Sequence, residues 1–240
     1  MEPSDNPLHD TPLHPAVTAL RQLFFTRLME QSPRSVLDVA CGDAHLLRAL
    51  KERGVRAVGV ESSEERVNAA REQGFEVYHG DAESLHFEDG LFDWTAMRHA
   101  AHHLADPELG IRELSRVAGT GFIAAEPWRE LAEPAQQLAA EWDAWCRVQE
   151  RRRGDIHHDN LVIASLSKWL ATPDQWICEY TYYQPAGVRP LDEVRAQAES
   201  LSPLATDAEL SERDRLLTSA ARVGVGITGT AILVARRQPS

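Results

Sequence analysis

One stretch, residues 35–45, constrains the fold more than any other part of this 240-residue chain. An apolar run around Asp38 ends in a turn of small residues from Ala40 to Ala44, and a helical pattern begins at His45. A strand that passes through such a turn into a helix brings backbone N–H groups close to a bound ligand. The stretch therefore predicts a ligand-binding turn, with a merely close-packed strand-to-helix turn as the alternative.

Strand and helix patterns alternate from residue 35 to residue 125. Strands are predicted for residues 35–39, 56–60, 75–79, 92–97 and 121–125. Helices are predicted for residues 16–29, 45–53, 62–73 and 107–117, the third beginning with a capping box of Ser62 and Glu65. Strands that alternate with helices of this length predict an α/β fold with a doubly wound, mostly parallel sheet and helices on both faces.

The pattern changes after Trp128. Helices are predicted for residues 133–153, 160–170, 191–201 and 207–221, and strands for residues 176–183 and 228–236, the last one antiparallel. Two further strands make a seven-stranded sheet. We expect a single domain over residues 16–240, with residues 129–172 as a helical cap inserted after strand five, and a mobile arm over residues 1–15.

Composition excludes several classes of function. The net charge of −12 argues against nucleic-acid binding, which needs a basic surface. Cys41, Cys146 and Cys178 are widely spaced, so neither a disulfide framework nor a zinc site is expected. No apolar run reaches the roughly 20 residues of a membrane span, and the N-terminus does not resemble a signal peptide. A cytoplasmic protein without nucleic-acid or membrane partners is predicted, and the oligomeric state stays open.

Two carboxylates follow the next two predicted strands. Glu61 lies 61 − 42 = 19 residues beyond Gly42, close to the offset of about 20 residues expected for an acid that binds ribose hydroxyls. Asp81 follows the third strand, where a carboxylate can accept from an exocyclic amine such as that of adenine. An exposed acid at a helix start is the alternative for Glu61. Because the carboxyl ends of parallel strands meet at one edge of a sheet, the three segments together predict a nucleoside site.

These residues resemble a known family. The segment VLDVACG (residues 36–42) looks like the first motif of class I S-adenosylmethionine-dependent methyltransferases of the small-molecule type, with a Rossmann-like fold. The segment GDAESLHF (residues 80–87) resembles the second motif, and RELSRV (residues 112–117) resembles the helix before the fifth strand. The resemblance implies S-adenosylmethionine as cofactor. The residues that it assigns to the methionine part, the ribose, the adenine and the rest of the cofactor site are Asp38, Ala40, Cys41, Gly42, Glu61, Ser62, Asp81, Ala82 and Arg98.

The sequence departs from this family in its turn. Ala40 and Ala44 occupy positions where the family usually has glycine. We expect the methyl group of Ala44 to lie where the cofactor passes.

Histidines follow the fourth predicted strand, where the resembling family places the methyl acceptor. His102 and His103 are the candidate bases, because imidazole accepts a proton near neutral pH. Glu126, just past the fifth strand, is expected to orient an imidazole, and His99 is expected to contact the acceptor. The alternative is a histidine that only packs the helix start.

A second polar segment follows the long helix after strand five. Asp155, His157 and His158 are predicted to contact substrate, with a solvated loop or a metal site as the alternatives. Trp128 is expected to wall the acceptor site. No metal is assigned.

The sequence thus predicts S-adenosylmethionine-dependent methyl transfer to an oxygen or nitrogen atom of a small molecule, and a basic or neutral acceptor is favoured. One alternative is a protein that binds S-adenosylmethionine without methylating. A nicotinamide-dependent oxidoreductase is disfavoured, because the G-x-G-x-x-G pattern is absent.

Overall fold

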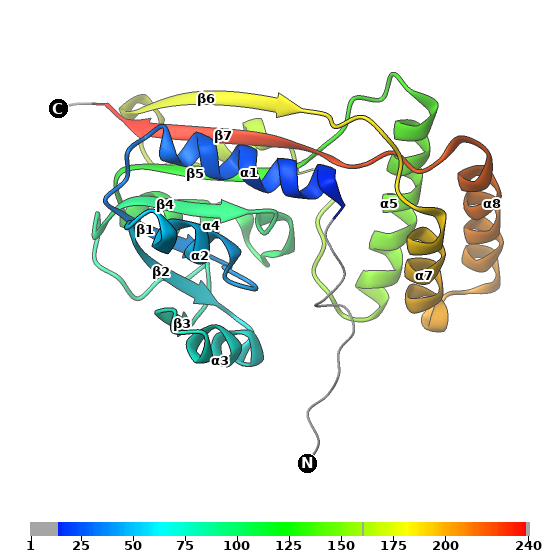
Figure 1. Cartoon of the computed structure of the whole chain (residues 1–240), viewed down its shortest axis with the longest axis horizontal. Helices are drawn as coiled ribbons and strands as arrows, with labels where there is room; N and C mark the ends of the chain where they lie inside the picture. The colour runs from blue at the N-terminus through cyan, green and yellow to red at the C-terminus, as the bar shows by residue number, and fades with distance from the viewer. Residues whose placement is uncertain (1–13, 160, 239–240) are drawn as a thin grey trace, which may run out of the picture.

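The computed structural model describes residues 14–159 and 161–238. The predicted arm over residues 1–15 lies outside these ranges except for its last two residues. Seven strands form one sheet, as predicted, in the order β3-β2-β1-β4-β5-β7-β6 (Figure 1). The strands are β1 (Ser35–Val39), β2 (Arg56–Glu61), β3 (Val77–His79), β4 (Phe92–Arg98), β5 (Ala118–Trp128), β6 (Trp176–Tyr183) and β7 (Gly229–Arg237).

Strands β1 to β5 are parallel, and β7 runs antiparallel to both β5 and β6. The mostly parallel α/β fold is therefore confirmed. The carboxyl ends of β1, β2 and β4 lie side by side, because Asp38 pairs with Gly59 and Ala96 in the register of the sheet. The segments that follow these strands consequently share one edge.

Helices cover both faces of the sheet. The helices are α1 (Pro15–Met29), α2 (His45–Glu52), α3 (Glu64–Glu72), α4 (Pro107–Val117), α5 (Pro134–Arg152), α6 (Ile163–Leu166), α7 (Leu191–Leu201) and α8 (Asp207–Val223). Phe24 and Leu28 of α1 and Leu50 of α2 pack against one face. Ile111 of α4 and Leu166 of α6 pack against the other. Each face is thus sealed by an apolar side of its helices, the arrangement that a parallel sheet requires.

Three helices form a separate layer beyond one end of the sheet. Figure 1 shows α5, α7 and α8 standing together there, and Trp142 and Trp145 of α5 share a buried cluster with Val194 of α7 and Leu216 of α8. The short α6, by contrast, packs on the sheet. The predicted cap over residues 129–172 therefore contributes one helix to this layer, and the domain boundaries stay a prediction.

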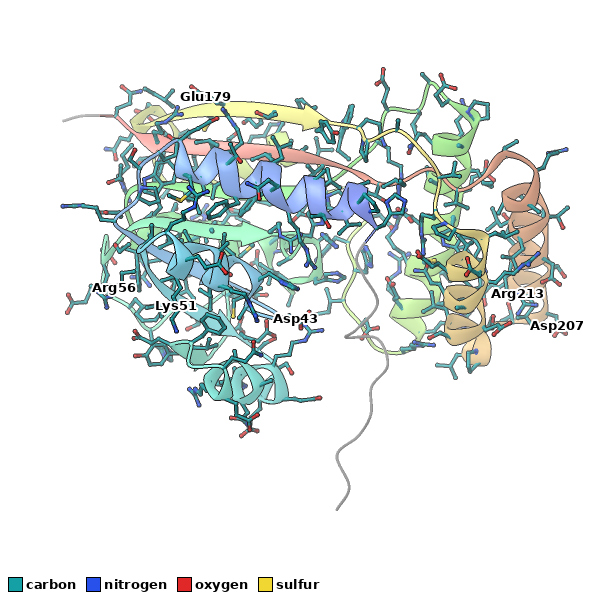
Figure 2. All side chains as sticks on the ribbon, viewed as in Figure 1. Asp43, Lys51, Arg56, Glu179, Asp207 and Arg213 are labelled. Atoms are coloured by element: carbon teal, nitrogen blue, oxygen red, sulfur yellow. The ribbon has the colours of Figure 1, made fainter. Side chains whose placement is uncertain are left out.

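Many charged side chains lie on the outside of these layers, and Arg56 and Glu179 project from the edge of the molecule in Figure 2. Among the described residues, no helix has the length and apolarity needed to cross a membrane.

Some predicted boundaries were wrong. The N-cap of α3 is Ser63, whose hydroxyl accepts from the Arg66 N–H, and not Ser62. The reason is that β2 extends to Glu61, so Ser62 is needed for the connecting turn, where its carbonyl lies 2.9 Å from the His79 ring. Strand β5 begins at Ala118, before the start predicted at residue 121. The helix predicted over residues 160–170 is reduced to α6 and the 3-10 turn Ser167–Trp169.

Close packing beneath the first turn requires Gly59. A methyl group added there would lie 2.7 Å from Cys41 Sγ and 2.9 Å from Leu47 Cδ1. We expect Gly59→Ala to lower the free energy of unfolding by about 1–3 kcal/mol, because overpacking forces backbone shifts. Urea denaturation measures this change. The Cys41→Ala exchange should recover part of the loss in a Gly59→Ala background, and a double variant no more stable than Gly59→Ala would contradict this packing explanation.

Candidate functional site

The turn after β1 alternates left-handed residues. Ala40, Gly42 and Ala44 have φ angles of +57°, +53° and +58°. A left-handed conformation costs a non-glycine residue about 1–2 kcal/mol, so the two alanines are held there by their surroundings. The small residues from Ala40 to Ala44 thus form a turn between β1 and α2.

Gly42 and Ala44 face opposite sides of this turn. Ala44 is fully buried in a cluster with Leu47, Val67 and Val77. A methyl group added at Gly42 would meet no atom within 4 Å. The expectation that the Ala44 methyl group lies in the path of a ligand is therefore wrong, because α2 turns that methyl group into the core. The open side of the turn is at Gly42.

Glu61 closes the turn from the neighbouring strand. Its two carboxylate oxygens accept the N–H groups of Gly42 at 2.9 Å and of Ser63 at 3.0 Å. The Ser62 hydroxyl lies 3.5 Å from Oε1 as a third, long contact, and because a carboxylate has about four lone-pair positions, Glu61 can still accept from a ligand hydroxyl group. The buried Glu61 side chain is thus fixed by the backbone on both sides.

A second acid and two guanidinium groups lie beside this turn. Burial raises the pKa of Asp38 to about 7, although the positive charge of Arg98 opposes this shift. Burial likewise lowers the pKa of Arg98, with Arg21 of α1 as a further cause. Among the described residues, neither guanidinium makes a hydrogen bond, and Arg21 Nε is buried without a partner. A ligand that carries both an ammonium and a carboxylate group would supply the missing partners of Asp38 and of the two arginines.

The remaining residues assigned to the cofactor lie at the same edge in different environments. Asp81 is exposed, with Oδ1 accepting from the Glu83 N–H at 2.9 Å, while Ala82 is buried. Ser62 is exposed in the turn after β2. Cys41 is buried under the turn, where desolvation raises the pKa of its thiol. A ligand over the turn would therefore meet the backbone of Cys41 and not its sulfur.

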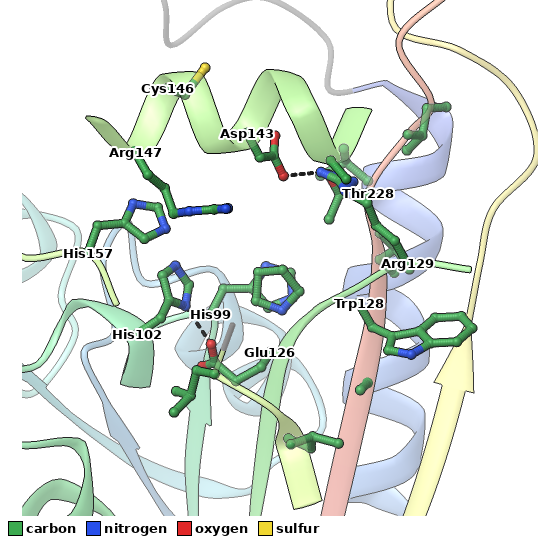
Figure 3. A pocket seen from close by; sticks show the side chains of 18 of the residues that line it. His99, His102, Glu126, Trp128, Arg129, Asp143, Cys146, Arg147, His157 and Thr228 are labelled. Carbon is green, nitrogen blue, oxygen red and sulfur yellow. Dashed lines mark hydrogen bonds and ion pairs between the residues drawn. The ribbon is translucent and has the colours of Figure 1, made fainter. Parts of the chain in front are cut away.

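A cavity of about 930 Å³ adjoins this edge, between the ends of β4, β5 and β7 and the helix α5 (Figure 3). Arg98 lines this cavity and also lies near Asp38, so it connects the two places. Of the residues predicted for the acceptor side, those that line the cavity are His99, His102, Glu126, Trp128, His157 and His158.

A buried histidine and a buried glutamate form a hydrogen-bonded pair in the cavity wall. His102 Nδ1 lies 2.5 Å from Glu126 Oε2, and the other carboxylate oxygen accepts the Ala101 N–H at 3.1 Å. A carboxylate oxygen accepts hydrogen bonds, so Nδ1 is the donor of this contact, and Nε2 is the ring nitrogen left to accept a proton. The predicted pairing of Glu126 with an imidazole is therefore present in the structure.

His99 lies beside this pair with a different character. Its backbone is left-handed, with φ of +52°, and its Nε2 lies 3.2 Å from Thr230 Oγ1. Burial, helped by the charges of Arg98 and His102, lowers the pKa of His99 to about 3. The His99 ring consequently stays neutral and is suited to hydrogen bonding and to packing.

The segment after α5 folds back over His102 and His103. His157 Nδ1 lies 2.5 Å from Glu150 Oε2, and the His158 N–H donates to the His102 carbonyl at 2.8 Å. The rings of His102, His103 and His157 have centroids 4.1–4.9 Å apart. The exposed His103 and Asp155, however, are not among the residues that line the cavity.

Among the described residues, no group of three or more histidine, cysteine, aspartate or glutamate side chains is placed to hold a metal ion.

Several residues at these sites were not predicted from the sequence. Arg21 belongs to α1, and its charge acts on Arg98, a proximity that no sequence signal indicates. The cavity is also lined by Arg129, Asp143, Arg147 and Arg189. The sequence pattern does not reveal how the segments that carry these residues pack.

Part of the chain is similar in sequence to known proteins. A family model described as a methyltransferase domain matches residues 37–124. Ajmaline N-methyltransferase from Rauvolfia serpentina is 35% identical over 123 residues, which cover 45% of this chain and 42% of that protein. The chain thus matches less than half the length of this relative.

Solved structures share the fold at lower identity. The YcgJ protein from Bacillus subtilis has a TM-score of 0.62 and 17% identity, covering 91% of this chain and 99% of that one. The [4+2]-cyclase SpnF also has a TM-score of 0.62, with 19% identity, covering 96% of this chain and 85% of that one. At these identities the likeness establishes the fold alone.

Proposed function

We propose that this chain, a member of the class I S-adenosylmethionine-dependent methyltransferases, transfers a methyl group to an oxygen or nitrogen atom of a small-molecule metabolite. S-adenosylmethionine is the cofactor of this family. The observation that carries the proposal is the buried His102–Glu126 pair, which faces a cavity that is linked to Asp38 through Arg98.

The residues at the sheet edge fit this cofactor. Asp38 is suited to the methionine ammonium group, and Arg98 with Arg21 to its carboxylate, because Asp38 is buried beside Arg98 and neither half-buried guanidinium makes a hydrogen bond to the described residues. Glu61 has lone pairs left for the ribose hydroxyls, and Asp81 with Ala82 stands at the position assigned to the adenine. When bound, the cofactor supplies a methyl group on a positively charged sulfur.

The chain's own part in the reaction is alignment and proton transfer. Holding an acceptor in the cavity converts a bimolecular step into an effectively unimolecular one. His102 is placed to take the proton that an hydroxyl or ammonium acceptor must lose, and Glu126 then stabilises the imidazolium that forms. The neutral ring of His99 and the wall formed by Trp128 are proposed to position the acceptor.

Formation of S-adenosylhomocysteine tests the proposal. The full chain is incubated with S-adenosylmethionine carrying a labelled methyl group and with a panel of hydroxyl and amine metabolites. We expect labelled product and S-adenosylhomocysteine in equal amounts for at least one acceptor. Conversion of a metabolite into a product that carries no labelled methyl group would favour the second candidate, a protein that uses the cofactor without methylating. That candidate is kept because one structural neighbour is a [4+2]-cyclase, and a fold alone does not fix the reaction.

Thermal stabilisation separates both candidates from an oxidoreductase. S-adenosylmethionine and S-adenosylhomocysteine should each raise the melting temperature, since a ligand that binds only the folded state stabilises it. Stabilisation by NAD and by neither of the other two would contradict the assignment of the cofactor.

The open side of the turn gives a matched pair of variants. We expect Gly42→Ala to weaken S-adenosylhomocysteine binding at least tenfold, because the added methyl group would occupy the side that faces the ligand. Stability should fall by only about 1 kcal/mol, the cost of one more left-handed alanine. The control is Ala44→Gly, whose methyl group is buried, and it should bind normally. Calorimetric titration measures both, and equal affinities for the two variants would contradict the placement of the ligand.

A further inference from the structure

Three arginines gather in the cavity wall of a chain that is otherwise acidic. Arg129 follows β5, Arg147 belongs to α5, and Arg189 precedes α7, and all three line the cavity. The chain as a whole has 37 acidic residues against 25 basic ones. Segments far apart in the sequence thus bring positive charge to one place.

These guanidinium groups keep hydrogen-bond donors in reserve. Arg129 Nη2 donates to Asp143 and to Thr228, while its buried Nη1 has no partner among residues 14–159 and 161–238. Arg147 donates from Nε to Asp159 at 2.9 Å, and its two terminal nitrogens make no hydrogen bond within the same ranges. Figure 3 shows Arg147 reaching into the space between His157 and Arg129.

Arg189 likewise has more hydrogen-bond donors than partners among the described residues. Its Nη1 donates to the neutral Gln197 at 2.8 Å, and no carboxylate of the described residues forms an ion pair with it. The positive charges of Arg147 and Arg189 act on Arg129, where they contribute to its lowered pKa after burial, the largest cause. Asp143 opposes this shift, so Arg129 has one carboxylate partner while Arg147 and Arg189 act on it as like charges.

The carboxylates of the same cavity are already engaged. Glu126 binds His102, Asp143 binds Arg129, and Glu150 binds His157. The fourth, Glu193, is exposed to solvent. The groups left without partners are consequently donors on cationic side chains. An amine that remains charged would meet three guanidinium groups and no free buried carboxylate.

Apolar side chains form another part of the wall. Trp128 and Tyr182 pack with ring centroids 5.3 Å apart, and Leu161, Ile163 and Ala231 also line the cavity. Such a surface suits a hydrocarbon or aromatic body. His102 and Glu126 lie across the cavity from Arg147 in Figure 3, so a molecule held at one end can present its reacting atom at the other.

We propose that the methyl acceptor is a metabolite with an apolar body and a carboxylate, and that Arg147, with Arg189 and Arg129 behind it, binds this carboxylate. This inference rests on the proposed function of the same cavity. It replaces the basic or neutral acceptor expected from the sequence, because guanidinium groups form charge-assisted, often bidentate hydrogen bonds with carboxylates.

Matched pairs of probes test the proposal on the full chain saturated with S-adenosylhomocysteine. Each pair is a carboxylic acid and its primary amide: benzoate and benzamide, 4-hydroxycinnamate and its amide, indole-3-acetate and its amide. Calorimetry gives the affinity of each. We expect at least one acid to bind tenfold or more tightly than its amide, and we expect Arg147→Gln to reduce this preference at least fivefold. Arg189→Gln should reduce it in the same direction.

The control variant is Arg195→Gln, which removes one positive charge from the exposed side of α7 outside the cavity. It should keep the acid-to-amide preference of the natural protein. Binding of S-adenosylhomocysteine to every variant shows that the variant is folded. Normal S-adenosylhomocysteine binding with no acid preferred over its amide, or with a preference unchanged in Arg147→Gln, would overturn the carboxylate proposal alone. Failure to bind S-adenosylhomocysteine would instead count against the proposed function.

Discussion

Replacing His102 by glutamine is expected to slow methyl transfer by about 10²–10⁴-fold, the usual contribution of a general base. The reason is that the lone pair of His102 Nε2 is the proposed proton acceptor, held in direction by the 2.5 Å contact of Nδ1 with Glu126. The affinity for S-adenosylhomocysteine should stay within about twofold, because His102 belongs to the acceptor side. Steady-state rates with a labelled methyl donor and calorimetric titration measure the two effects.

Two companion variants make this result specific. Glu126→Gln keeps a hydrogen-bond acceptor for the ring but loses the charge that stabilises an imidazolium, so its rate should lie between those of the natural protein and His102→Gln. His103→Gln should lose less than tenfold, because the exposed His103 ring is absent from the cavity wall. A His102→Gln variant with unchanged turnover, or a larger loss in His103→Gln, would show that the base has been placed on the wrong residue.

Cofactor affinity should depend steeply on pH through Asp38. The pKa of this carboxyl in the free protein is raised to about 7 by burial, so below pH 7 the group is mostly protonated. A protonated carboxyl cannot pair with the methionine ammonium group, and binding must then expel a proton. The dissociation constant of S-adenosylhomocysteine should therefore rise about tenfold for each pH unit below 7. Titrations between pH 5 and pH 8 measure the slope.

The same group should make the cofactor-free protein less stable as the pH rises. A carboxyl with a raised folded-state pKa favours folding fully below its unfolded value, here 3.8, and this contribution is lost as the pH rises through about 7. The shift of about three units corresponds to a loss of up to about 4 kcal/mol. Asp38→Asn should therefore be more stable than the natural chain at pH 8 in the absence of cofactor, measured by urea denaturation.

Asp38→Asn should at the same time bind the cofactor more weakly at pH 8 and lose the slope below pH 7. A gain in stability together with a loss of binding is expected when a residue of a functional site is replaced. If the variant retains the full pH dependence of S-adenosylhomocysteine affinity, a different group titrates, and Asp38 does not contact the ammonium group.

The sheet and its edge were predictable because each depends on local signals. Apolar runs around Leu37, Val58 and Trp94 mark buried parallel strands, and the acids Glu61 and Asp81 follow strands whose carboxyl ends must meet. The pairing of Glu126 with a histidine after β4 followed from the same rule, since β4 and β5 are neighbours. These predictions needed strand order and no side-chain packing.

The wall of the cavity could not be predicted in the same way. Arg147 and Arg189 reach the cavity because α5 stands against α7 and α8, an arrangement fixed by contacts such as that of Trp142 with Gln197, 55 residues away. The sequence predicts a helix over residues 133–153 and leaves open what that helix packs on. The direction of the Ala44 methyl group depended in the same manner on α2 and α3, which bury it.

Calorimetric titration of the natural chain and of Glu61→Ala with S-adenosylhomocysteine at pH 8 tests the cofactor site most directly. Glu61 lies at the centre of that site, fixed by the N–H groups of Gly42 and Ser63. We predict one S-adenosylhomocysteine bound per natural chain and an affinity at least tenfold lower for Glu61→Ala, with NAD giving no heat. Absence of S-adenosylhomocysteine binding by the natural chain, or equal affinities for the two proteins, would contradict the assignment of this edge of the sheet as the cofactor site.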